Sequence, residues 1–153
     1  NRWYGFLIRK GGTCRLTDTA AIENHRDGML VQTGGTTHLE RCHVERNRMA
    51  GVAVVTKGQA TIADSVCNNN VNGLYVSALG TVDAKTSDFD NNRGSGISVN
   101  TDASATARDC NARGNLHGIT SGPGSELRTS GLTLALNQES DKKVHVDGRH
   151  IEE

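Results

Sequence analysis

The sequence predicts an all-β solenoid, a parallel β-helix of about seven coils of 22–23 residues, with three short strands in each coil. Asparagines recur at steps of 22 or 23 residues, at Asn1, Asn24, Asn47, Asn70, Asn92, Asn115 and Asn137. Glycines follow the same period, at Gly5, Gly28, Gly51, Gly73, Gly96 and Gly118. Between them, apolar residues alternate with spacers, and no helical stretch is visible. A fixed period of this length over almost the whole chain is typical of one small unit stacked on itself.

Each coil has three places where inward-facing residues alternate with outward-facing ones. In the coil that begins at Gly51, the inward pairs are Val52 and Val54, Ala60 and Ile62, and Ser65 and Cys67. A spacing of two residues is the side-chain period of a β-strand. Each strand is therefore expected to pair with its counterpart one coil away, about 4.8 Å along the axis. A last strand is expected at residues 144–146, after a short insertion around residues 138–142.

The repeated glycines and asparagines are expected to shape the turns. Each glycine follows a turn and begins a strand, where a positive φ or tight packing favours a residue without a Cβ atom. An inward-turned asparagine can bond to free backbone groups and to the asparagine of the next coil. The expected ladder consists of Asn24, Asn47, Asn70, Asn92, Asn115 and Asn137. Replacing Asn70 is thus expected to destabilise the fold far more than replacing Asn68, which we expect to be exposed.

Composition limits the possible functions. The 153 residues fit one domain, residues 1–153, which we expect to be a segment of a longer solenoid or of a larger protein. With 17 basic and 17 acidic residues the net charge is zero, which argues against nucleic acid as a partner. The longest apolar run, residues 52–55, is too short for membrane insertion. The ends of the solenoid are expected to be protected by flanking coils or by end-to-end association.

The four cysteines, Cys14, Cys42, Cys67 and Cys110, all fall on inward positions. None of the pairs considered is suited to a disulfide, because their members lie several coils apart or in different columns. The chain contains no C-x-x-C motif, and His38 and His43, with Glu40 and Glu45, do not converge as a metal site requires. We therefore expect no metal and no cofactor. Free buried thiols favour a reducing compartment.

The pattern Asn-x-x-x-Gly-Ile-x-Val at residues 92–99 resembles the short repeat of the right-handed parallel β-helix superfamily. The resemblance covers nearly the full chain and implies a right-handed coil. The superfamily includes pectate lyases, alginate epimerases and lyases, phage tailspikes and non-catalytic repeat modules, and many of its members are secreted. Its enzymes usually bind substrate on the outer face of the strand that follows the long loop, which here corresponds to the second strand of each coil.

The outward face of that second strand is the most polar face of the predicted rod. If the protein is an enzyme, the candidate catalytic residues are His38, Asp64, Asp83, Lys85 and Arg108. An Arg or Lys suits neutralisation of a uronate carboxylate, and a His or Lys suits proton transfer. Candidate binding residues on this face are Arg15, His38, Glu40 and Arg41. Opposite charges also follow each other from coil to coil, as in Asp18 and Arg41, which indicates cross-coil ion pairs on a solvated face.

A second candidate surface lies on the first strand, where Tyr75 is expected to point outward beside Leu7, Leu30 and Ala53. This mildly apolar stripe is a candidate docking strip for a partner. The favoured hypothesis is a non-catalytic β-helix module, a scaffold or binding surface for a protein or a polysaccharide along one flank. The near absence of long insertions before residue 138 favours it. The alternative is a carbohydrate-active enzyme, namely a polysaccharide lyase, a uronate epimerase or a glycosidase.

Overall fold

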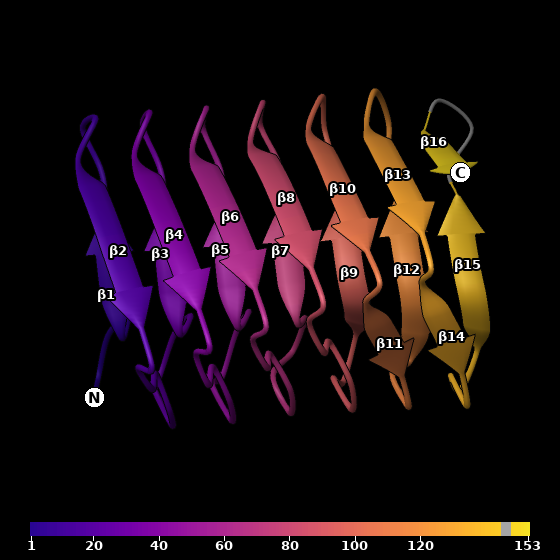
Figure 1. Ribbon diagram of the computed structural model, residues 1–153, viewed down its shortest axis with the longest axis horizontal. Coiled ribbons are helices and arrows are strands. Elements are labelled where there is room, and N and C mark those ends of the chain that lie inside the picture. Colours follow the sequence, from indigo (N-terminus) through magenta and orange to yellow (C-terminus); the bar gives the residue numbers. More distant parts are fainter. Residues whose placement is uncertain (145–147) are drawn as a thin grey trace.

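The computed structural model describes residues 1–144 and 148–153, and its elements in this part of the chain are all β-strands. Figure 1 shows the strands stacked side by side along one axis, with the N-terminal coil at one end and the C-terminal coil at the other. The predicted parallel solenoid is therefore confirmed. Two long sheets run along the rod, and each contains seven strands.

The first sheet contains the strand that begins each coil. Its strands, in spatial order, are β1 (Phe6–Ile8), β3 (Met29–Val31), β5 (Val52–Val54), β7 (Leu74–Val76), β9 (Ser95–Val99), β12 (His117–Ser121) and β15 (Ser140–Val144). Neighbouring strands are parallel and keep one register, so that Leu30 pairs with Ala53 and Ala53 with Tyr75. Equivalent residues of successive coils therefore lie directly beside each other.

The second sheet packs against the first across the core. It contains β2 (Thr13–Thr17), β4 (Thr36–Glu40), β6 (Gln59–Ala63), β8 (Thr81–Lys85), β10 (Ser104–Arg108), β13 (Glu126–Ser130) and β16 (Arg149–Glu152). All its pairs are parallel, and those from β2 to β13 have the register that the repeat predicts, as in His38 beside Thr61 and Thr61 beside Asp83.

The third side of the coil is less regular than predicted. Among the described residues, only β11 (Asn111–Arg113) and β14 (Thr133–Ala135) pair as strands there, and the earlier coils contribute single parallel bridges that run from Ala20 to Asn111. The reason is the short length of this side. In the second coil, positive φ angles at Arg41 and Arg46 leave only four residues between two bends.

The last coil also differs from the prediction. Residues 138–142 are not an insertion, because β15 begins at Ser140 and pairs with β12. The prediction was wrong here because the repeat glycine is replaced by Asp141 in this coil. The structure identifies the position, since the carbonyl of Asp141 faces Gly118 as the carbonyl of Gly96 faces Gly73. The expected strand at residues 144–146 lies mostly outside the described residues.

Of the two reasons proposed for the repeated glycines, tight packing is the correct one. A Cβ atom on Gly73 would lie 2.7 Å from the carbonyl oxygen of Gly96 and 2.8 Å from Nδ2 of Asn92. The positive φ angles lie elsewhere, in the turns between the first and second strands. Leu79, for example, has a φ of 65° at the position that Gly11 and Gly34 occupy in earlier coils.

The asparagine ladder is present in the structure. In its centre, Oδ1 of Asn70 accepts hydrogen bonds from the backbone N–H and from Nδ2 of Asn47, at 2.9 and 3.1 Å. Nδ2 of Asn70 donates to the carbonyl of Val44 at 2.9 Å. The same backbone-to-Oδ1 bond links Asn24 to Asn47, Asn47 to Asn70, Asn70 to Asn92, Asn92 to Asn115, and Asn115 to Asn137. The ladder thus satisfies backbone donors that the sheets leave free at this corner.

Asn68 is not the exposed residue that we expected. It is half-buried, and its Oδ1 accepts a 2.7 Å hydrogen bond from the backbone N–H of Asp90. A second, outer row of side-chain-to-backbone bonds therefore accompanies the ladder.

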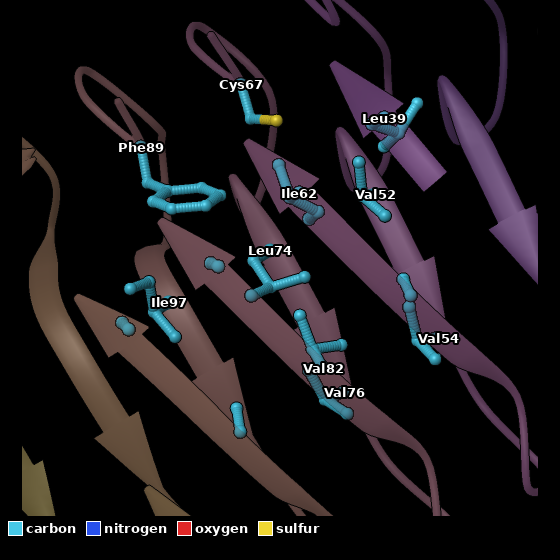
Figure 2. Packing of buried hydrophobic residues seen from close by; sticks show 14 of the residues in the cluster. Leu39, Val52, Val54, Ile62, Cys67, Leu74, Val76, Val82, Phe89 and Ile97 are labelled. Carbon is cyan, nitrogen blue, oxygen red and sulfur yellow. The ribbon is translucent and has the colours of Figure 1, made fainter. Parts of the chain in front are cut away.

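The core between the sheets is a stack of aliphatic layers. Figure 2 shows Val52, Leu74 and Ile97 of the first sheet facing Leu39, Ile62 and Val82 of the second. Phe89 is the largest fully buried side chain, and it lies at the third side of the coil near Cys67. The inward columns predicted from the repeat are thus the core of the rod, which leaves the outer faces of the two sheets available for function.

Candidate binding groove

The outer face of the second sheet has the predicted charged character, and its charges are largely paired with one another. Arg41 binds Asp18 through two hydrogen bonds of 2.8 and 3.0 Å, and Arg15 lies 3.6 Å from Glu40. The Arg41 guanidinium lowers the pKa of Asp18. Cross-coil pairing of this kind is typical of a solvated strand face and contributes little stability.

The candidate catalytic residues do not gather at one point of this face. Asp83 and Arg108 form an ion pair with both carboxylate oxygens 2.7 Å from Nη2, and Lys85 is the register neighbour of Arg108. His38 lies two coils before Asp83, about 10 Å along the axis. Asp64 lies in the bend after β6. The arrangement brings together Asp83, Lys85 and Arg108 and leaves the other two apart.

A groove of about 460 Å³ lies instead on the outer face of the first sheet, over β3, β5 and β7. Leu30, Ala53 and Tyr75, which pair side by side in the sheet, form its floor. The segment from Arg48 to Ala50 lies along one side, and Val55 lines the groove from the end of β5. Of the predicted binding residues, Tyr75 lies in this groove, whereas Arg15, His38, Glu40 and Arg41 lie on or next to the other sheet.

The floor of the groove is more enclosed than an outer strand face usually is. Leu30 and Ala53 point away from the core, yet only 8% and 5% of their surfaces are exposed. They form a small hydrophobic cluster with Ala50, against which Tyr75 and Val55 pack. The groove is therefore a preformed apolar surface that is separate from the core.

Asp27 is the acidic residue that lines this groove, and sequence reasoning missed it. Only 7% of its surface is exposed, and its Oδ1 accepts a 2.8 Å hydrogen bond from the backbone N–H of Ala50. Burial raises the pKa of Asp27, and the Ala50 hydrogen bond offsets this only in part. Within residues 1–144 and 148–153, no basic side chain forms an ion pair with it.

The neighbouring cation, Arg26, contacts aromatic side chains, and its charge lowers the pKa of Asp27 by less than burial raises it. Its guanidinium carbon lies 5.1 Å from the ring centroid of Trp3 and 5.5 Å from that of Tyr4, and Nη1 donates to the Tyr4 hydroxyl at 2.9 Å. Such cation–π contacts attract the guanidinium to the faces of the rings. A sequence signal for Asp27 did exist: it precedes the repeat glycine Gly28, where the next two coils have the uncharged residues Ala50 and Asn72.

We expect the buried charge of Asp27 to lower the stability of the fold at neutral pH. Because its pKa is raised in the folded state, that state holds the proton more tightly than the unfolded chain does. The free energy of unfolding should therefore fall as the pH rises through the folded pKa. Asp27→Asn removes this effect, so the variant should be more stable than the wild type at pH 7, and the difference should shrink toward pH 4.

Urea unfolding of both proteins between pH 4 and pH 8 measures this difference. Asp64→Asn is the control, because it removes one negative charge from an exposed bend. A difference between Asp27→Asn and wild type that is independent of pH, or that grows as the pH falls, would contradict the raised pKa.

The rest of the groove contains few polar groups. Oδ1 of Asn72 accepts a hydrogen bond from the backbone N–H of Ser95 at 2.9 Å, and Arg48 is exposed at the rim. Beyond Tyr75 the floor becomes hydroxylated. There Thr120 donates to Ser98 at 2.9 Å, and both side chains are mostly buried. These hydroxyls bond to each other, so they extend the face without adding charge.

Three of the four cysteines are buried. All four cysteines are free, as predicted. Burial raises the pKa of Cys67 far above its usual range and that of Cys110 to about 11, which makes both thiols poor nucleophiles. His117 is half-buried, with its Nδ1 2.9 Å from Oγ of Ser140. Within residues 1–144 and 148–153, no three His, Cys, Asp or Glu side chains lie close enough together to hold a metal ion.

The comparisons with known proteins concern the fold. A family model described as a right-handed beta helix region matches residues 1–139. No curated protein and no solved structure shows a significant similarity to the chain. In the described ranges, no helix has the length and hydropathy needed to cross a membrane.

Proposed function

Because the chain belongs to the right-handed β-helix family, which here establishes a fold and not a reaction, we propose that it is a non-catalytic module that binds a partner chain in the groove over β3, β5 and β7. The observation that carries this proposal is the preformed apolar floor of Leu30, Ala53 and Tyr75. An enclosed apolar surface outside the core is a common feature of binding sites.

Two features favour binding over the alternative of carbohydrate chemistry on the second sheet. Asp83 and Arg108, the best placed of the candidate catalytic residues, already neutralise each other. His38 and Asp64 stand apart from them. A lyase or an epimerase needs its cation and its base around one sugar unit. The paired charges of this face are better suited to keeping the rod soluble.

Met49 provides a direct test of the groove. Its side chain lines the groove and is 49% exposed, so Met49→Glu places a charge there without disturbing the core. Leu79→Glu is the matched control, because Leu79 is 52% exposed in a turn that does not line the groove. We expect ligands selected from a glycan array and from a library of short peptides to bind Met49→Glu at least tenfold more weakly, and Leu79→Glu as well as the wild type.

Ligands that bind both variants equally, or the absence of any ligand in both collections, would overturn the proposal. Cleavage or epimerisation of a polyuronate by the wild type would also overturn it, if Asp83→Ala or Lys85→Ala abolished the activity.

A further inference from the structure

The chemistry of the groove indicates what kind of chain it accepts. Most of its lining residues are aliphatic, namely Leu30, Met49, Ala50, Ala53, Val55 and Val71. A polysaccharide presents many hydroxyl groups, and each of them needs a hydrogen-bonding partner when it is buried. The groove has few such partners, whereas it is suited to an aliphatic side chain of a protein.

Asp27 adds a second, independent requirement. It is a carboxylate more than nine-tenths buried in an apolar groove, and among the described residues it has no ionic partner. A charge in such surroundings interacts more strongly with an opposite charge than a solvated one does. It favours a cationic group and disfavours an acidic ligand such as a polyuronate. Arg48 lies at the exposed rim, where solvent screens its charge.

The dimensions restrict the occupant further. The floor runs along the axis of the rod from Leu30 to Tyr75, two coil steps apart, which is about 10 Å. An extended chain covers this distance with about three residues. The site therefore accommodates a short linear segment.

We propose that the groove binds a short extended segment of another protein, which places an aliphatic side chain over Leu30 and Ala53 and a lysine or arginine side chain against Asp27. This inference rests on the proposed function, since it names the occupant of the same groove. The basic side chain supplies the ionic partner that Asp27 lacks, and the aliphatic one covers the apolar floor. The energetic cost of the buried carboxylate in the free protein is then offset in the complex.

The test uses a positional-scanning library of pentapeptides, acetylated and amidated so that the termini carry no charge. The library is bound to the wild type and to Asp27→Asn, Asp64→Asn and Met49→Glu. We expect the wild type to select lysine or arginine at one position next to an aliphatic residue. Asp27→Asn should bind the selected peptide at least tenfold more weakly and lose the basic preference. Asp64→Asn should retain both, because its charge lies outside the groove.

The Asp27→Asn substitution keeps an acceptor for the Ala50 N–H and is expected to leave the fold more stable, so lost binding would not reflect unfolding. Peptides that bind in a Met49-dependent way without basic selection, or that bind Asp27→Asn equally well, would overturn this inference and leave the groove as a binding site. Glycans that bind in a Met49-dependent way would overturn the peptide occupant alone. If neither class binds in a Met49-dependent way, the inference and the proposed function both fail.

Discussion

Replacing Asn70 with alanine is expected to lower the free energy of unfolding by about 2–6 kcal/mol, since each orphaned buried polar group costs about 1–3 kcal/mol. Asn70 is fully buried. Its loss leaves the backbone N–H of Asn47 without its acceptor and the carbonyl of Val44 without the donor that Asn70 supplies. Both groups lie at a corner where water has no access, and a side chain with a single methyl group reaches neither.

Chemical denaturation measures this effect, with Gln59→Ala as the control. Gln59 lies away from the asparagine ladder, at the start of β6 in the second sheet, and its side chain is exposed. Its truncation should change the unfolding free energy by less than about 0.5 kcal/mol. Equal midpoints for the two variants would show that the ladder contributes nothing to stability. Asn68 is unsuitable as a control because it bonds to the backbone of Asp90.

The fold was predictable because every coil repeats the same spacing of asparagines and the same alternation of inward and outward residues. The spacing of Asn47, Asn70 and Asn92 fixed the period, and the alternation around Val52 and Val54 fixed which side chains face the core. In a parallel stack, the register of one coil sets the register of the next, so a local pattern predicts the whole architecture. The position of the strand in the last coil was predicted wrongly because Asp141 replaces the repeat glycine there.

The groove was less predictable, because it also depends on lining residues outside the strands that form its floor. The period of two correctly placed Leu30, Ala53 and Tyr75 on the outer side of the first strand. It did not indicate that Arg48, Met49 and Ala50 would line a groove together with them, or that Leu30 and Ala53 would be buried. The candidate catalytic residues were placed on the charged face of the second sheet because charged residues are visible in a sequence. The pairing of these charges becomes visible only in the structure.

Asp27 illustrates the same difference. Its position before Gly28 is visible in the sequence, but its burial comes from the neighbouring coil, whose Ala50 donates to its carboxylate. The contacts of its sequence neighbour Arg26 with the rings of Trp3 and Tyr4 are likewise visible only in the structure. Repeat analysis treats such a position as a variable one.

Replacing Phe89 with alanine is expected to lower the free energy of unfolding by about 3–5 kcal/mol, because it leaves a cavity in a close-packed core. The ring is fully buried, and the coils before and after have the small residues Cys67 and Ala112 at the same position. The ring thus fills the space that two small side chains leave, of which Figure 2 labels Cys67, and neither neighbour is large enough to close the cavity.

Leu136→Ala is the matched control for Phe89→Ala, since the Leu136 side chain is 88% exposed and its truncation should be nearly neutral. Unfolding in urea compares the two variants, and native-state hydrogen exchange locates the loss, which should be greatest for the amides of the coils that contain Cys67 and Ala112. A Phe89→Ala protein as stable as Leu136→Ala would mean that the stacked columns tolerate voids. The stability of the rod would then depend on its backbone ladders and on the asparagines, and not on the packing of its interior.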